Sequence, residues 1–314
     1  FLPPEEVIET AGGTEALQIA FSCLLDQGDE ILIPEPFYPN YRTFVNLTGA
    51  VIRPVATCAE NGYQFTCRQI EERITPNTRA ILVTNPGNPT GVVLSPEDLR
   101  SLAEIAWEHE LFLLCDEVYR EYVYGQMKPG SLLSLAGYEE NIVVIDSVSK
   151  LFSACGARIG CLITRNEAFR SRAMKYCLGR MSCASAEQLA AAALYDGLTS
   201  EYLDSLRRIY KGRRDALLPS LQRIPGAAFS APQGSFYIMG RIPVDNADRF
   251  QQWLLTDFEN RGETVMFAPG EAFYATPGLG YDEIRLACVN DEQTLRRAAE
   301  LLTRGIEEYN RRKS

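Results

Sequence analysis

The sequence predicts an α/β protein, with a mainly parallel sheet in a large domain and a smaller α+β domain at the C-terminus. In the first half, apolar runs of four to six residues alternate with amphipathic helical patterns. That alternation is typical of parallel strands buried on both faces. In the second half, a long helical stretch over 201–223 precedes short strands and two more helices. We therefore expect a large domain over residues 1–198 and a small domain over residues 199–314, which includes the long connecting helix.

The individual elements follow from the same patterns. In the large domain we expect strands at 7–10, 31–34, 80–84, 111–116, 141–146 and 159–164. Helices are expected there at 14–26, 38–47 and 95–110. The last of these has a clear start signal, with Ser95 as N-cap and Pro96 at the first helical position. In the small domain we expect strands near 236–239, 265–268 and 284–288, and helices over 247–260 and 293–309.

Composition excludes several classes of function. A net charge of -10 argues against nucleic acid or an anionic membrane as a partner, because both attract basic surfaces. No apolar run approaches the ~18 residues that a membrane-spanning helix needs. We therefore expect no nucleic-acid partner and no membrane insertion.

The cysteines and the single histidine limit the chemistry further. The nine cysteines show no CxxC spacing, which indicates reduced thiols of a cytoplasmic protein rather than a disulfide framework or a metal site. His109 is the one histidine and lies near the end of a helical pattern, so we interpret it as a surface residue. With this single histidine, a catalytic Ser-His-Asp triad or a histidine-based metal site is not expected in this chain.

Four polar clusters each follow a predicted strand, at its carboxyl end. They read "AGGTEA" at 11–16, "NPGNPTG" at 85–91, "DEVY" at 116–119 and "SVSK" at 147–150. The carboxyl ends of parallel strands lie on one edge of a sheet, which is where open α/β sheets bind their ligands. We expect these clusters to form one site.

The first and last clusters are suited to an anion. Gly13 and Thr14 open a helix, whose first N–H groups and dipole attract negative charge. A glycine turn with a threonine cap would explain the same residues structurally. Ser147, Ser149 and Arg158 could complete a phosphate site with two hydroxyls and a planar guanidinium.

Two charged residues follow apolar strands, where they are costly without a partner. Asp116 ends the run "LFLLC", and a lone carboxylate there needs a facing cation, such as a protonated ring nitrogen. Lys150 follows "VVIDSVS" and is one of only five lysines in the chain. It reads either as a strand-end lysine that reaches to solvent or as a Schiff-base lysine with a lowered pKa. Asn88, between two prolines, would be a fixed amide able to bind a ligand.

A phosphate site, a carboxylate for a pyridinium nitrogen and a Schiff-base lysine together describe a site for pyridoxal 5'-phosphate. The ordered segments "GGTEAL", "GDEILIPEPFYPNY", "NPGNPTG", "CDEVYREY", "DSVSKLFSACGARIG", "PQGSFY" and "IRLACVND" cover essentially the whole chain. In this order they resemble class I/II pyridoxal-phosphate-dependent aminotransferases of PLP fold type I, and most of all the bacterial aspartate aminotransferase-like proteins.

The resemblance implies roles in catalysis and in cofactor binding. Lys150 would form the Schiff base and shuttle the substrate's Cα proton, and Asp116 would keep the pyridine nitrogen protonated. Tyr119 and Asn88 would hydrogen-bond the cofactor's phenolic oxygen, and Tyr38 would stack on its ring.

The resemblance also implies which residues bind the substrate and the cofactor's phosphate. Arg285, together with Asn88, would bind the substrate, with the guanidinium on its α-carboxylate. A strand-end salt bridge is the structural alternative for Arg285. The cofactor's phosphate would be held by Gly13, Thr14, Ser147 and Arg158.

The resulting hypothesis is an enzyme that moves an amino group between an L-amino acid and a 2-oxo acid, first of all aspartate and 2-oxoglutarate. Two alternatives use the same scaffold, a C–S β-lyase and an aminocyclopropane-carboxylate-synthase-like enzyme. A third alternative, from another class, is a pyridoxal-phosphate-binding regulatory domain fused to a DNA-binding module.

The resemblance also implies a homodimer. The sequence begins at Phe1 and enters a strand almost at once, so we expect an N-terminal segment to be missing. In relatives such a segment packs on the neighbouring subunit. Its loss would weaken the dimer and loosen cofactor binding.

Overall fold

The computed structural model describes residues 2–125, 127 and 130–312, and within them it contains a seven-stranded sheet and a four-stranded sheet. The seven strands have the order β1-β7-β6-β5-β4-β2-β3. Their bounds are β1 Val7–Thr10, β2 Glu30–Glu35, β3 Val51–Ala56, β4 Thr78–Thr84, β5 Phe112–Asp116, β6 Ile142–Ser147 and β7 Gly160–Ile163. β7 runs antiparallel to both of its neighbours, β1 and β6, and the other pairs are parallel, so the predicted α/β class with a mainly parallel sheet is confirmed.

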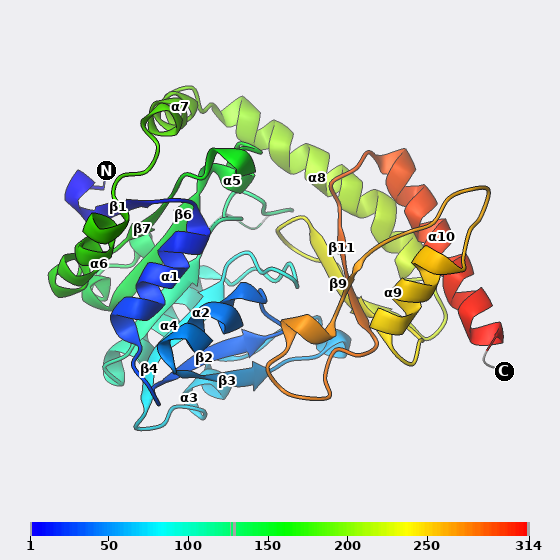
Figure 1. Ribbon diagram of the computed structural model, residues 1–314, viewed down its shortest axis with the longest axis horizontal. Coiled ribbons are helices and arrows are strands. Elements are labelled where there is room, and N and C mark those ends of the chain that lie inside the picture. The colour runs from blue at the N-terminus through cyan, green and yellow to red at the C-terminus, as the bar shows by residue number, and fades with distance from the viewer. Residues whose placement is uncertain (1, 126, 128–129, 313–314) are drawn as a thin grey trace.

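Helices cover both faces of this sheet (Figure 1). One face carries α1 Gly13–Leu24, α2 Asn40–Thr48 and α6 Glu167–Arg180, and the other carries α3 Cys67–Glu71 and α4 Pro96–Glu108. Two further helices, α5 Val148–Leu151 and α7 Ser185–Asp196, pack in smaller apolar clusters beside these cores. On β2, Ile31 and Ile33 join the core under α1 and α2, whereas Leu32 joins the opposite core under α4. Because side chains alternate along a strand, a central strand needs apolar residues on both faces, which explains the continuous apolar runs.

The edge strand β3 escapes prediction because its pattern is broken. Pro54 lies in its middle, and proline cannot donate to a sheet ladder. The strand tolerates it because β3 is the last strand of the sheet and pairs only with β2.

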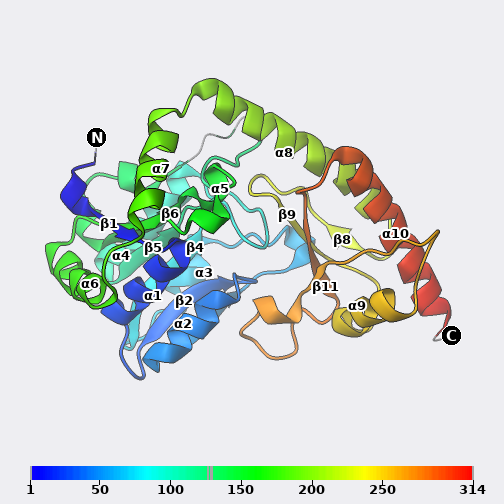
Figure 2. The same cartoon turned by 45° about the horizontal axis from the view of Figure 1, so that its top comes forward.

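The four-stranded sheet follows the long helix α8 Ser200–Leu221, which leads away from the large sheet (Figures 1 and 2). Its strands are β8 Ala228–Phe229, β9 Tyr237–Arg241, β10 Ala268–Pro269 and β11 Glu283–Ala287, in the order β10-β11-β9-β8. Together with α8, the helices α9 Ala247–Thr256 and α10 Glu292–Arg311 enclose a separate apolar core on this sheet. The strand expected at 265–268 is shorter than predicted, since only Ala268 and Pro269 pair with β11.

The C-terminal part also contacts the first core. Met239, Phe273 and Tyr274 belong to the same apolar cluster as the α4 face of the large sheet. The Glu35 carboxylate, at the end of β2, accepts hydrogen bonds from the backbone N–H groups of Ala275 and Thr276 at 2.9 and 3.1 Å. These contacts fix the four-stranded sheet against the carboxyl edge of the large one. The division at residues 198 and 199 stays a prediction.

None of the helices within residues 2–125, 127 and 130–312 has both the length and the apolar character that crossing a bilayer requires.

Candidate active site

The ten residues to which the resemblance assigns roles all line one cavity of about 290 Å³ at the carboxyl edge of the large sheet, and Ser149 lines it as well. They come from the ends of β1, β4, β5 and β6, from the segments that follow β2 and α5, and from β11 of the smaller sheet. The ten are Gly13, Thr14, Tyr38, Asn88, Asp116, Tyr119, Ser147, Lys150, Arg158 and Arg285. The parallel strands thus bring together residues that lie more than 270 positions apart in the chain.

One end of the cavity is built for an anion. The first turn of α1, with Gly13 and Thr14, lies there with its backbone N–H groups and the positive end of its dipole. The guanidinium of Arg158 stands beside it, because Nη2 donates to the carbonyl of Ala11 at 3.0 Å and Nη1 to the carbonyl of Cys155 at 2.9 Å. The Oγ atoms of Ser147 and Ser149 lie 2.8 Å apart on the same wall.

The position of Arg158 depends on Gly12. Gly12 has a φ of 83°, in the left-handed region, and a Cβ atom built there would lie 2.1 Å from Nη2 of Arg158. Only glycine allows both this backbone conformation and this close approach. The second glycine of "AGGTEA" opens the helix, and the first makes room for the guanidinium.

Asp116 lines the cavity at the end of β5 and is 5% exposed. Burial raises the pKa of its carboxyl group to about 6, against the opposing effect of a hydrogen bond from Tyr41. Such a carboxylate is poorly solvated, so a cationic ligand facing it would be strongly favoured.

Lys150 is held on the short helix α5. Ser147 caps this helix by accepting a hydrogen bond from the N–H of Ser149 at 3.1 Å, and the hydroxyl of Tyr122 donates to the carbonyl of Lys150 at 2.8 Å. The Nζ atom lies 5.9 Å from the ring centre of Tyr119 and 5.8 Å from that of Phe236. The amine therefore projects into a partly aromatic environment inside the cavity.

Arg285 reaches the cavity from the smaller sheet. Its Nη1 donates to Oδ1 of Asn88 at 2.9 Å. Its guanidinium lies over the ring of Tyr237, 4.1 Å from the ring centre, and near the ring of Phe273 at 4.9 Å. Stacking and hydrogen bonding fix the plane of the guanidinium, which leaves its other donors for a carboxylate.

The two tyrosines among the ten hold fixed positions as well. Tyr119 is buried, its hydroxyl donates to that of Tyr237 at 3.3 Å, and burial holds its pKa well above 10. Tyr38 packs edge-on against Tyr41 at 5.5 Å, and its hydroxyl accepts a hydrogen bond from Asn40 at 2.8 Å. Burial raises the pKa of the Tyr38 hydroxyl too, so both hydroxyls remain protonated near neutral pH.

Several wall residues were not singled out from the sequence. Tyr237 appears there only as the last letter of "PQGSFY", and its contact with Arg285 depends on pairing between β9 and β11. The others that line the cavity are Leu17, Val118 and Cys155.

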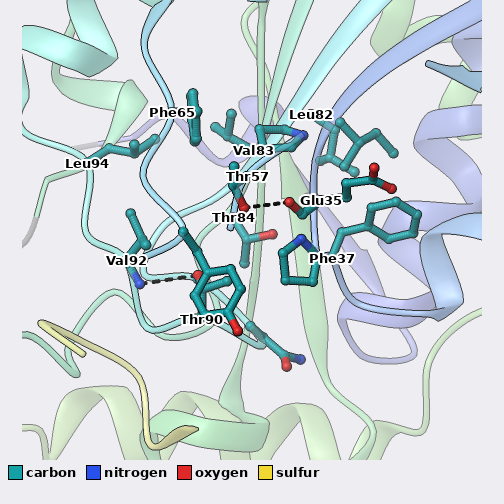
Figure 3. Close-up of a pocket in the computed structure, with 16 residues that line it drawn as sticks. Glu35, Phe37, Thr57, Phe65, Leu82, Val83, Thr84, Thr90, Val92 and Leu94 are labelled. Carbon is teal, nitrogen blue, oxygen red and sulfur yellow. Dashed lines mark hydrogen bonds between the residues drawn. The ribbon is translucent and has the colours of Figure 1, made fainter. Parts of the chain in front are cut away.

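A second cavity lies behind Asn88 and Thr84, between the end of β2 and the loop after β4 (Figure 3). It measures about 40 Å³, which is room for water molecules but not for an organic cofactor. Hydrogen bonds tie its walls together, from Thr57 Oγ1 to the carbonyl of Glu35 at 2.6 Å and from the N–H of Val92 to Thr90 Oγ1 at 3.3 Å. This second cavity is therefore too small for the cofactor, whereas the cavity of about 290 Å³ has room for one and carries the predicted site residues.

Comparison with known proteins gives the family. The model of the aminotransferase class I and II family matches residues 2–302. The chain is a class I and II aminotransferase. It is 31% identical over 312 residues to aspartate aminotransferase of Geobacillus stearothermophilus, across 97% of this chain and 77% of the relative. It is 31% identical over 289 residues to aromatic-amino-acid aminotransferase 2 of Thermococcus litoralis, across 91% and 72%.

The solved structures agree with the family assignment. A double mutant of Thermus thermophilus aspartate aminotransferase matches with a TM-score of 0.86 at 29% identity, over 97% of this chain and 77% of that one. An alanine aminotransferase from Pyrococcus furiosus matches with the same TM-score at 30% identity, over 98% and 77%. The predicted resemblance and the predicted fold are confirmed.

Aminotransferases of this family depend on pyridoxal 5'-phosphate, so the predicted cofactor is confirmed as well. The donor set of the cavity fits it. An anion-binding end, a buried carboxylate and an amine correspond to the phosphate, the ring nitrogen and the aldehyde of the cofactor. In this aminotransferase they lie in one cavity, as that chemistry requires.

Proposed function

We propose that this aminotransferase exchanges an amino group between an L-amino acid and a 2-oxo acid, with aspartate and 2-oxoglutarate as the first pair to test. The single observation that carries the proposal is the arrangement of Lys150, Asp116 and Arg285 around one cavity. It combines an amine, a carboxylate and a fixed guanidinium. The choice of aspartate is supported by relatives named aspartate aminotransferase, whereas other relatives are named for aromatic substrates.

In this proposal Lys150 is the residue that reacts. Its amine would hold the cofactor covalently and, when not so engaged, would move a proton at the substrate's Cα. The bound cofactor supplies an electron sink for the bonds at Cα. The neighbouring aromatic rings of Tyr119 and Phe236 limit access of water to the amine.

The other cavity residues bind and orient. Asp116 would hold the proton on the cofactor's ring nitrogen, and Tyr119 and Asn88 would donate hydrogen bonds to its phenolic oxygen. Tyr38 would stack on the ring. The phosphate would be held by Gly13, Thr14, Ser147 and Arg158.

Substrate binding is assigned to Arg285 and Asn88. The stacked guanidinium of Arg285 presents parallel N–H groups to the α-carboxylate that every amino-acid and oxo-acid substrate carries. Asn88 fixes that guanidinium through the 2.9 Å hydrogen bond and so sets the direction of the substrate.

We also propose that the chain forms a homodimer in the cytoplasm. Large apolar side chains are exposed on and beside α6 and α7, among them Leu178, Met181 and Leu189, each more than 70% exposed. Large exposed apolar side chains on these two helices favour association with a second copy of the chain. The nine cysteines are all free thiols, as in a reducing compartment.

A donor and acceptor screen tests the activity and the substrate. The purified enzyme, loaded with pyridoxal 5'-phosphate, is incubated with each L-amino acid and 2-oxoglutarate, and the new oxo acid is measured. The proposal expects amine transfer that depends on the acceptor and is fastest with aspartate. Release of pyruvate or ammonia without an acceptor would identify a lyase instead. Transfer from other amino acids but not from aspartate would contradict aspartate as the donor.

A further inference from the structure

Tyr41 does not line the cavity, but its hydroxyl contacts the Asp116 carboxylate. It lies on α2, has no exposed surface, and packs against the rings of Phe37 at 6.2 Å and Tyr38 at 5.5 Å. Its Oη atom is 2.7 Å from Oδ2 of Asp116 and 2.8 Å from Oγ1 of Thr84. A buried tyrosine thus connects two neighbouring strands at the carboxyl edge of the sheet.

The direction of these hydrogen bonds follows from the number of protons. An ionised carboxylate can only accept, so the single hydroxyl proton of Tyr41 points at Asp116. Thr84 must then donate to Tyr41. Burial holds the pKa of Tyr41 well above 10, so its hydroxyl stays a donor at any working pH.

The two carboxylate oxygens of Asp116 are therefore occupied differently. Oδ2 accepts the short bond from Tyr41, whereas the only hydrogen bond that Oδ1 accepts within residues 2–125, 127 and 130–312 is a longer one, 3.3 Å, from the N–H of Val118. Thr84 and Asp116 are also direct partners across β4 and β5, which fixes the spacing of the three residues. Oδ1 is the oxygen with capacity left for a ligand in the cavity.

We propose that Tyr41, supported by Thr84, is a positioning residue for Asp116. It keeps the carboxylate ionised and turns Oδ1 toward the ring nitrogen of the cofactor. This inference rests on the proposed role of Asp116 in binding that nitrogen. Without the Tyr41 hydroxyl, Oδ2 would be buried without a donor, and the protonated acid would be favoured.

Other groups near Asp116 do not replace this donor. Asp146, at the end of β6, disfavours ionisation of Asp116, and Lys150 favours it as a charge rather than as a hydrogen-bond partner. Arg120 is engaged with Asp146, Nη2 to Oδ2, at 2.9 Å. The remaining titratable groups that face Asp116 or adjoin it in the chain are Tyr38, Cys115, Glu117 and Tyr119.

The test is the pH dependence of cofactor affinity in Tyr41→Phe. The dissociation constant for pyridoxal 5'-phosphate is measured from pH 5 to 9 in the full chain, and the carboxyl titration of Asp116 is followed in the cofactor-free protein by carbon NMR. Phenylalanine keeps the ring in the core and removes only the hydroxyl. We expect both midpoints to move up by about one pH unit, with roughly tenfold weaker binding on the acidic side. Unchanged midpoints would overturn the proposal.

A second variant and a matched control complete the design. Thr84→Val, nearly isosteric, should move both midpoints in the same direction by a smaller amount, because it weakens Tyr41 as a donor. Tyr309→Phe removes another tyrosine hydroxyl that donates to an aspartate, Asp245, at 3.1 Å, and should leave both midpoints unchanged. A shift in Tyr309→Phe equal to that in Tyr41→Phe would contradict a local effect.

Failure of this inference can be told apart from failure of the proposed function. If Asp116→Asn abolishes transamination and Tyr41→Phe moves neither midpoint, only the role of Tyr41 is wrong. If Asp116→Asn remains fully active, the assignment of Asp116 is wrong, and the role of Tyr41 is overturned with it.

Discussion

Arg285 donates a hydrogen bond from Nη1 to Oδ1 of Asn88 at 2.9 Å, and this contact joins the four-stranded sheet to the loop after β4. Asn88 is 8% exposed, so its amide oxygen has little access to water and depends on this partner. The proposed site for the substrate's carboxylate thus combines a residue of the smaller sheet with a residue of the loop after β4.

We predict that Arg285→Lys raises KM for the amino acid and for the oxo acid by about 10- to 100-fold, because an ammonium cannot form the paired hydrogen bonds of a stacked guanidinium. The cofactor's affinity should change little. Steady-state kinetics with both substrates measure this. Arg241→Lys, on the neighbouring strand and paired with Glu60, is the matched control and should leave KM unchanged. An unaltered KM in Arg285→Lys would mean that Arg285 is structural.

Gly12→Ala should weaken binding of pyridoxal 5'-phosphate by about tenfold or more. The new Cβ would collide with Nη2 of Arg158 at 2.1 Å and displace the guanidinium from the phosphate end of the cavity. Equilibrium titration with the cofactor and with inorganic phosphate measures the loss.

Gly28→Ala separates collision from backbone strain in that experiment. Gly28 has a φ of 87°, close to the 83° of Gly12, but a Cβ there meets nothing within 4 Å. This variant should lose some stability and keep its cofactor affinity. Equal losses of affinity in both variants would contradict the role given to Arg158.

Asp116→Asn should stabilise the cofactor-free protein at pH 8 while removing most of its activity. The carboxyl pKa rises from 3.8 in the unfolded chain to about 6 in the folded one, so ionisation costs the folded state more. The free energy of unfolding therefore falls as pH rises from about 4 to about 6. This difference in pKa between the two states corresponds to about 3 kcal/mol of stability, which the parent protein loses as pH rises and the Asp116→Asn variant keeps.

Urea unfolding of both cofactor-free proteins at pH 4 and pH 8 measures that difference. We expect nearly equal stability at pH 4 and a more stable variant at pH 8. A parent that is at least as stable as the variant at pH 8 would show that Asp116 is not destabilised by its burial.

Much of the site could be predicted from the sequence because its residues follow strands. Asp116 ends one apolar run and Lys150 follows shortly after another, and these positions place both residues near the carboxyl edge of a parallel sheet. Tyr41 could not be found in this way. A buried aromatic residue in a helix reads as core, and its hydrogen-bond partner lies 75 positions away.

In the fold, too, some elements could be predicted from the sequence and others could not. The central strands carry continuous apolar runs and were predicted, whereas β3, interrupted by Pro54, was not. The strand expected at 265–268 has a suitable pattern, but only its last residue pairs with β11. Pairing of edge segments depends on the neighbouring strand, which local sequence does not contain.

The central claim is that Lys150 is the residue that binds the cofactor covalently. The enzyme is incubated with pyridoxal 5'-phosphate, reduced with borohydride and digested, and the modified peptide is located by mass spectrometry. We predict one modified lysine, Lys150, together with loss of the label and a fall of several orders of magnitude in turnover for Lys150→Ala. A label on Lys175 or Lys211 in its place, or normal turnover in Lys150→Ala, would contradict the account.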